Sequence, residues 1–317
     1  MTDRYRPTAP DVERVRDLLR SLVGADVMGV ETIRPGEWSS AYRAQTRSGA
    51  LVVRYSSLRE DFDKDRVAAR WSSEALPVPR ILHLGEAQGG WVAVSESLPG
   101  GHLDALDELG VRAVLPSLFG ALDALRVLAP AGDGYGGWDG SGHAPHSTWQ
   151  DYLLDVALDD PKRRAYGWRP LLAASSIGTS LFDEAFDRMR RLLDLLPDSR
   201  HVIHSDLVNR NVLVEGVRIT AVLDWGSSIY GDFLLDLAWI TYFAPWFKQW
   251  SGVDFEAEAA RHYAVTGLEV PHLAERLRCY ELYIGLSHLA YSAFRERPEA
   301  IEWNARRTRE VLASLPS

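Results

Sequence analysis

The hydrophobic pattern of the chain changes once, near residue 98, and this change limits the folds that it can adopt. Before that point, short apolar runs of strand length alternate with turn residues. After the turn-rich segment PGGHLD, apolar residues recur mainly at helical spacing. The length of 317 residues is about twice that of a usual domain. We therefore predict an α+β protein with two lobes, a small one over residues 1–97 and a larger, mainly helical one over residues 98–317.

The first lobe has the pattern of a five-stranded sheet with two helices. One helix is expected over residues 10–23, where Thr8 and Asp11 are candidates for a capping box. A second helix is expected over residues 61–73, after the third strand and before a proline-rich turn. The predicted strands span residues 27–33, 41–46, 51–55, 80–84 and 91–95.

The second lobe reads as helices around one β-rich segment. Helices are expected over residues 149–156 and 181–196, and Ser147 or Thr148 would cap the first of them. Residues 201–225 contain two short strand patterns, NVLV and RITAVLDW, on either side of a Glu-Gly turn. This arrangement predicts a small hairpin among the helices.

The composition disfavours several classes of function. The formal net charge of −9 disfavours binding to nucleic acid or to an anionic membrane and favours a cationic small-molecule ligand. The first residues lack the apolar core of a signal peptide, and no apolar run is long enough to span a membrane. The single cysteine, Cys279, cannot form a disulfide within the chain, which suits a reducing compartment. We therefore expect a cytoplasmic protein, a monomer or a weak homodimer, that binds neither nucleic acid nor membranes.

The segment HSDLVNRN, residues 204–211, carries the clearest chemical signal. It has the spacing H-x-D-x-x-x-x-N that is typical of the catalytic loop of kinases. Asp224 follows thirteen residues after Asn211, at the end of the predicted hairpin. In phosphoryl transfer, one carboxylate orients the attacking hydroxyl group and accepts its proton, while an amide oxygen and a second carboxylate hold Mg²⁺. The pattern therefore predicts that Asp206, Asn211 and Asp224 meet at one point and serve a kinase reaction.

Two residues of this segment also have a purely structural interpretation. A lone H-x-D pattern occurs in capped turns, where Asp206 would only bind backbone amides. The matching asparagine, the hairpin and the closing Asp224 favour the kinase interpretation over the turn. His204 is expected to brace the loop by hydrogen bonds rather than to take part in the chemistry.

The longer segment HSDLVNRNVLVEGVRITAVLDWGSSIYGDFLLDLAW resembles the aminoglycoside phosphotransferase family, and most closely its hygromycin B phosphotransferases. The stretches LVVRYSS, FDKDR, ALPVPRILHLGE and STWQDYL support the resemblance and occur in the expected order. The resemblance implies a protein-kinase-like fold, with a five-stranded antiparallel sheet in the small lobe. It also implies Mg²⁺ as cofactor and ATP or GTP as co-substrate. Asp206 would be the catalytic base, and Asn211 and Asp224 would be the metal ligands.

The resemblance also assigns a phosphate-binding cation in the small lobe. Arg54 stands where the family usually has a lysine, and it keeps the positive charge. An acid of the following helix would hold Arg54, and Asp63 and Asp65 are the candidates. Either of them could instead be a solvated charge.

Four serines are expected around the nucleotide. The turn RPGEWSS has no G-x-G-x-x-G pattern, so Ser39 and Ser40 would donate hydrogen bonds to the phosphates. An ordinary hairpin turn is the alternative there. Backbone groups of Ser95 and Ser97, in the hinge between the lobes, would meet the edge of the purine.

The acceptor is expected to be a polar, cationic small molecule on the helical lobe beside Asp206. Asp232, Asp236 and Glu281 are candidate contacts, although the first two are better explained as structural supports of the metal loop. Ser227 departs from the hygromycin-type pattern, which has a glutamate there, and this puts hygromycin B itself in doubt. A metabolite or macrolide kinase of the same fold is one alternative. A catalytically silent nucleotide-binding scaffold is another.

Overall fold

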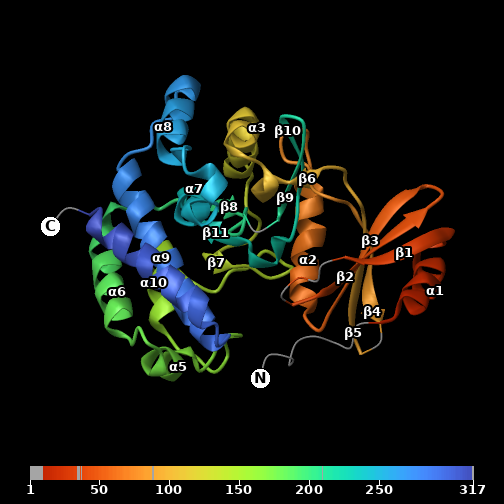
Figure 1. The fold of residues 1–317 in the computed structure, drawn as a ribbon, viewed down its shortest axis with the longest axis horizontal. Helices are drawn as coiled ribbons and strands as arrows, with labels where there is room; N and C mark the ends of the chain where they lie inside the picture. Colours follow the sequence, from red (N-terminus) through yellow and green to blue (C-terminus); the bar gives the residue numbers. More distant parts are fainter. Residues whose placement is uncertain (1–9, 34–35, 37, 88, 209, 316–317) are drawn as a thin grey trace.

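The computed structural model describes residues 10–33, 36, 38–87, 89–208 and 210–315. A β-sheet lobe and a larger helical lobe lie side by side, and α2 (Arg59–Ala68) lies between them (Figure 1). The sheet ends with Glu96, and Gly101 already pairs with a strand of the helical lobe. The chain therefore crosses between the lobes within a few residues of the change in sequence pattern.

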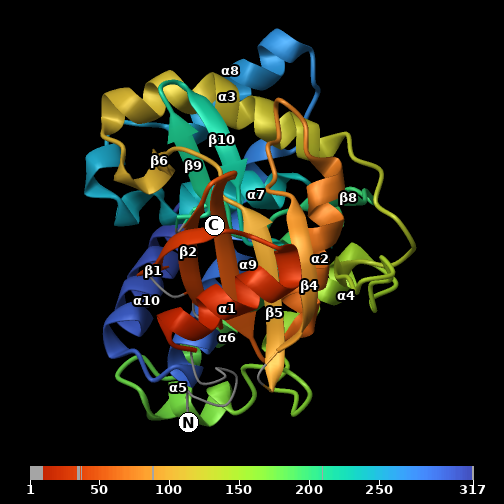
Figure 2. The ribbon, with the colours of Figure 1, turned by 90° about the vertical axis from the view of Figure 1, so that its right-hand side faces the viewer.

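The small lobe is the predicted five-stranded antiparallel sheet, and its strands lie in the order β1-β2-β3-β5-β4. Its strands are β1 (Val27–Ile33), β2 (Ser40–Thr46), β3 (Gly49–Ser56), β4 (Ile81–Ala87) and β5 (Gly90–Glu96). Helix α1 (Val12–Val23) lies across the outer face of the sheet (Figure 2). Its buried residues Val15 and Leu19 pack against apolar residues of the strands. This burial anchors α1 by the hydrophobic effect.

The two helices of this lobe begin and end for local reasons. Asp11 caps α1 by accepting a hydrogen bond from the N–H of Arg14 (2.8 Å), whereas Thr8 lies outside the described residues. The helix predicted over residues 61–73 begins two residues earlier, at Arg59. It ends earlier as well, at Ala68, and continues only as a short 3₁₀ turn (Ala69–Trp71).

The large lobe is built around the long helix α9 (Leu273–Phe294), which is buried along much of its length. Helices α6, α7 and α10 pack around it, and Cys279 is buried within it. The other helices are α3 (Glu108–Arg126), α4 (Trp149–Leu154), α5 (Trp168–Ala174), α6 (Ser180–Leu192), α7 (Leu234–Phe243), α8 (Phe255–Thr266) and α10 (Pro298–Ala313). Among the described residues, no helix has the length and apolarity needed to cross a membrane.

Two small sheets of the large lobe face α2. The predicted hairpin is confirmed as β9 (Val212–Glu215) and β10 (Arg218–Val222), and β6 (Gly101–His102) joins its edge. The second sheet has the order β7-β11-β8. Its strands are β7 (Gly136–Gly137), β8 (His201–Ile203) and β11 (Ile229–Gly231). The loops that follow β8 and β10 carry the predicted site.

Gly231 should be required by packing rather than by backbone conformation. A Cβ atom at this position would overlap the ring of Trp149, which is fully buried and donates a hydrogen bond to Tyr280 (3.1 Å). We predict that Gly231→Ala lowers the free energy of unfolding by about 1–3 kcal/mol, as overpacking does elsewhere. Urea unfolding measures the change. Gly137→Ala is the matched control, because a Cβ atom there would meet no atom within 4 Å; equal losses in both variants would contradict this explanation.

Candidate active site

The predicted catalytic loop connects β8 to β9, and the carboxylate of Asp236 fixes its start. Asp236 lies in the first turn of α7 and accepts hydrogen bonds from the backbone N–H groups of His204 (2.9 Å) and Ser205 (2.7 Å). Ser205 has a φ of 64°, a left-handed conformation that is unfavourable for a residue with a Cβ atom. Burial raises the pKa of Asp236 to about 7, and the two N–H donors oppose this shift. The loop therefore depends on a carboxylate from another element.

His204 connects this loop to the end of β10. Its ring is fully buried, and Nε2 donates to the carbonyl oxygen of Leu223 (2.8 Å). Nδ1 accepts the backbone N–H of Asp206 (3.2 Å), so the bonds require the neutral ring with its proton on Nε2. Burial lowers the pKa of His204 to about 4, which keeps the ring neutral. These contacts are those of a bracing residue.

The side chains of Asp206 and Asn211 are in direct contact. Nδ2 of Asn211 donates to the carbonyl oxygen of Asp206 (2.8 Å) and to its carboxylate oxygen Oδ2 (3.0 Å). Both partners are acceptors, so the amide nitrogen faces them and the amide oxygen is left for another contact. The N–H of Leu223 donates to the carbonyl oxygen of Asn211 (2.7 Å), which places Asp224 beside the same strand end. The structure thus brings the three predicted residues together.

The oxygens of Asn211 and Asp224 fit the requirements of Mg²⁺. This ion is usually held by one or two carboxylates, with water and phosphate oxygens completing the octahedron. Asp224 has a left-handed backbone (φ 60°, ψ 70°), and its side chain is 52% exposed. Within the described residues, no cluster of three or more His, Cys, Asp or Glu could hold a metal alone. Water and the phosphate oxygens of a nucleotide would supply the other ligands of an ion held by Asn211 and Asp224.

Arg54 pairs with Asp65 and not with Asp63. The Arg54 guanidinium on β3 forms an ion pair with the buried Asp65 carboxylate on α2, and its Nη1 lies 3.7 Å from Oδ1 of Asp224. Burial alone would lower the pKa of Arg54, but the charges of Asp65 and Asp224 raise it. Burial also raises the pKa of Asp65 to about 6, against the effect of Arg54, so the pair remains ionised at neutral pH.

Asp63 points to the other side of α2. It forms ion pairs with Arg59 (2.9 Å) and Arg66 (2.8 Å). Both partners lie on α2 itself and are exposed, so the pairs contribute little to stability. The structure therefore gives Asp63 no contact with the candidate site, and of the two predicted acids only Asp65 reaches Arg54.

The serines expected at the nucleotide loop and at the hinge lie in or next to strands β2 and β5. Ser40 is the first residue of β2 and pairs with Tyr55, while Ser39 lies in the preceding turn. The rest of RPGEWSS is described only at Gly36 and Trp38. Ser95 lies within the ladder of β5, between β3 and β4.

Of the backbone groups of Ser97 that were expected at the purine, the N–H group has a partner within the sheet. This N–H group donates to the carbonyl oxygen of Ala50 (3.0 Å). The pairing of β3 with β5 thus continues beyond the last strand residue, Glu96. This donor is not available to a purine while that bond is intact.

Two of the carboxylates expected at the acceptor are already neutralised in the core. Asp232 is fully buried, pairs with Arg276 (2.7 Å) and accepts a hydrogen bond from Tyr280. Glu281 is also fully buried. It pairs with Arg278 and Arg307 and accepts a hydrogen bond from Thr241 (2.7 Å). Neither side chain presents a charge to a ligand, so the structure contradicts their expected role in binding the acceptor.

Asp236 does not bind an acceptor either, since it is 2% exposed and engaged with the catalytic loop. Its bonds to the loop agree with the structural support that the sequence favoured for it. The contact to an acceptor that was also proposed for it is not supported.

Sequence reasoning missed three residues that join the lobes. Lys64 of α2 reaches the turn after Asp224. Arg164 pairs with Glu60 and Asp61 at the start of the same helix. The segment FDKDR, which supports the family resemblance, was the only indication of Lys64 in the sequence. No local pattern indicated Arg164. Trp38 lies among side chains of the large lobe, with its ring centroid 6.3 Å from that of Tyr291.

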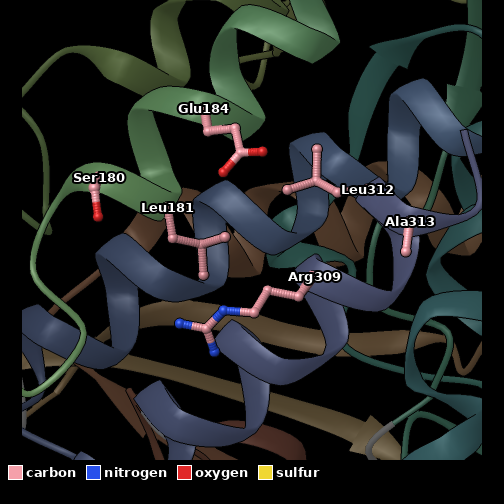
Figure 3. A pocket seen from close by; sticks show the side chains of 6 residues that line it. All are labelled: Ser180, Leu181, Glu184, Arg309, Leu312 and Ala313. Carbon is pink, nitrogen blue, oxygen red and sulfur yellow. The ribbon is translucent and has the colours of Figure 1, made fainter. Parts of the chain in front are cut away.

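A surface groove of about 410 Å³ lies between α6 and α10 (Figure 3). None of its lining residues belongs to the predicted site. They are Ser180, Leu181, Glu184, Arg309, Leu312 and Ala313.

The fold and these residues define a protein with the architecture of a kinase. A sheet lobe and a helical lobe meet at α2, and the carboxylates of Asp206 and Asp224 lie there with the amide of Asn211 and the guanidinium of Arg54. This is the set of groups that phosphoryl transfer requires.

The chain belongs to the phosphotransferase enzyme family, whose pattern it matches over residues 29–309. It is 31% identical to hygromycin-B 4-O-kinase of Escherichia coli over 260 residues, which are 81% of this chain and 72% of that protein. It is also similar to the crystal structure of the aminoglycoside phosphotransferase APH(4)-Ia, with a TM-score of 0.81, 26% identity, and coverage of 96% of this chain and 99% of that one.

A thermostable mutant of APH(4)-Ia, solved as a ternary complex with AMP-PNP and hygromycin B, matches equally well. The TM-score is 0.81, the identity is 27%, and 95% of this chain and 98% of that chain are covered. The spectinomycin phosphotransferase APH(9)-Ia is 12% identical, with a TM-score of 0.64 and coverage of 96% and 99%, and shares the fold alone. The expected family and fold are thus confirmed.

The buried His204 should make stability depend on pH in a defined direction. Its pKa of about 4 lies below the ordinary value of 6.5, so between these values the unfolded chain binds a proton that the native ring does not. Its contribution is complete above pH 6.5 and is lost as the pH falls toward 4. The loss over this range should be about 3 kcal/mol.

The comparison with His204→Gln isolates this effect. Unfolding by urea at several pH values gives the difference in stability between the two proteins. We expect this difference to shift against the wild type as the pH falls below 6.5. The raised pKa of Asp236 has the opposite effect but is present in both proteins. A difference that does not change with pH would show that His204 is not buried as a neutral ring.

Proposed function

We propose that this protein is a Mg²⁺-dependent kinase that transfers the γ-phosphate of ATP or GTP to a hydroxyl group of an aminoglycoside-type antibiotic. The main observation behind the proposal is the contact of Asn211 with Asp206. It lies beside the end of β10, where Asp224 follows Leu223. The similarity to hygromycin-B 4-O-kinase supports the class of acceptor. A reducing, cytoplasmic location agrees with the single buried cysteine.

Asp206 is assigned as the base in this mechanism. It would orient the acceptor hydroxyl group and take its proton as the oxygen attacks phosphorus. The hydrogen bond from Asn211 fixes the direction of the carboxylate before the acceptor arrives. Preorganisation of this kind reduces the reorientation that is needed in the transition state.

Asn211 and Asp224 are assigned to Mg²⁺, and Arg54 to the phosphates. The ion, when bound, neutralises charge on the phosphate oxygens and holds them in place. Arg54 reaches the same point from the sheet, where Asp65 keeps its guanidinium oriented. Because the guanidinium is planar and always charged, it can bind phosphate oxygens in a bidentate manner.

The choice of acceptor within the aminoglycosides is a separate question. Ser227 lies in the turn after Asp224, where the hygromycin-type pattern has a glutamate. A serine there removes one carboxylate that could bind an acceptor amine. We therefore propose the aminoglycoside class as acceptor, with hygromycin B as one compound to test.

A phosphorylation panel with Asp206→Asn tests the proposal. The purified protein is incubated with Mg²⁺ and ATP or GTP, and with hygromycin B, other aminoglycosides, macrolides and sugars. We expect phosphorylation of at least one aminoglycoside and resistance in a sensitive bacterium that expresses the protein. Asp206→Asn should lower kcat by about 10²–10⁴-fold, because a general base contributes that much, and should leave nucleotide binding nearly unchanged.

The other outcomes are equally informative. Phosphorylation of sugars or macrolides alone would identify a metabolite or macrolide kinase of the same fold. Nucleotide binding without turnover of any acceptor would favour a scaffold. Near-normal turnover by Asp206→Asn would remove this residue from the role of base.

A further inference from the structure

Lys64 is a buried lysine in the interface between the lobes. Its residue is 8% exposed, although lysine is rarely buried in proteins. The chain has two other lysines, Lys162 and Lys248, and both are exposed. The position of Lys64 is therefore unusual within this protein.

The ammonium group of Lys64 binds the turn that follows Asp224. Nζ donates to the carbonyl oxygens of Gly226 (3.1 Å) and Ser228 (2.9 Å). It also lies 5.3 Å from the ring centroid of Trp138, as a cation–π contact. An ammonium group has three donors, and these contacts account for its buried charge. An apolar side chain of the same length could satisfy neither carbonyl group.

Asp65, the next residue of α2, holds the same turn from the other side. Its carboxylate accepts the backbone N–H of Trp225 (2.9 Å) and pairs with Arg54. The lysine thus binds carbonyl oxygens of the turn while the aspartate binds an N–H group. Two adjacent residues of one helix therefore fix both kinds of backbone group directly after Asp224.

This arrangement matters because the backbone of Asp224 is strained. A φ of 60° in a residue with a Cβ atom costs about 1–2 kcal/mol, so the turn needs external contacts to keep it. A buried charge is itself unfavourable, and burial lowers the pKa of Lys64 to about 8. The unfavourable desolvation of the ammonium group offsets much of the stability that its hydrogen bonds to this turn provide. Stability alone therefore does not explain a lysine at this position.

We propose that Lys64 is a positioning residue for Asp224, which acts by holding the turn over residues 225–228 in the conformation that presents the carboxylate to Mg²⁺. The inference rests on the proposed Mg²⁺-dependent kinase function. It assigns to Lys64 no contact with nucleotide or acceptor. Its effect should therefore appear only where the metal takes part.

The test compares nucleotide binding with and without Mg²⁺ in Lys64→Met. Calorimetry should show about tenfold weaker ATP binding in the presence of Mg²⁺. The loss of one charge-assisted hydrogen bond changes a dissociation constant by about this factor. Binding without Mg²⁺ should be unchanged. The Mg²⁺ concentration for half-maximal turnover should rise by about the same factor, while the KM for the acceptor stays near that of the wild type.

Controls separate positioning from folding. Lys248→Met removes an exposed lysine and should change none of these values. Lys64→Gln keeps an N–H donor and should give an intermediate loss. Equal losses with and without Mg²⁺, or no loss in either, would overturn the proposal. It would also be overturned if neither Lys64 variant melted cooperatively, because the residue would then serve the fold alone. Absence of turnover in the wild type would instead count against the proposed function.

Discussion

The buried carboxylate of Asp65 connects three elements of the fold, one of which lies 160 residues away in sequence. It lies on α2, neutralises Arg54 of the sheet and accepts the N–H of Trp225 in the large lobe. The loss of either Arg54 or Asp65 would leave the charge of the other incompletely paired, which costs several kcal/mol in proteins. The position of Arg54 relative to the turn after Asp224 therefore depends on this side chain.

The other contacts between the lobes are individually weaker. Arg164 pairs with Glu60 and Asp61 at the start of α2, and its guanidinium lies 5.9 Å from the ring centroid of Trp38. The side chains of Arg164 and Glu60 are partly exposed to solvent, and ion pairs of this kind contribute about 0–1 kcal/mol each to the free energy of unfolding. The buried contacts of Lys64 and Asp65, by contrast, determine how α2 is oriented against the large lobe. The orientation of α2 thus depends on two adjacent residues.

The sequence predicted the elements and the proximity of Asp206 to Asn211 because both are encoded over short distances. The strands, the hairpin and the spacing from Asp206 to Asn211 all fall within a few residues of chain. The choice between Asp63 and Asp65 could not be made in the same way. The two acids are separated by about 200° around α2, so one must face away from the core. Which one faces inward depends on a turn 160 residues later in the chain.

The same limit explains the errors about the acceptor and leads to a different view of it. Asp232 finds Arg276 forty-four residues later in the chain, and Glu281 finds Arg307 twenty-six residues later, so a count of charges said nothing about their partners. The carboxylates near the turn after Asp224 are those of Asp206, Asp224, Asp65 and Asp61. Asp65 is paired with Arg54, and the Cβ of Asp61 would lie 3.0 Å from a Cβ atom added at Gly226. Asp61 is paired with Arg164, and a metal would neutralise Asp224. The recognition of an acceptor thus depends on which carboxylates keep a partner within the fold, and this pairing is set by the tertiary structure and not by the net charge of −9.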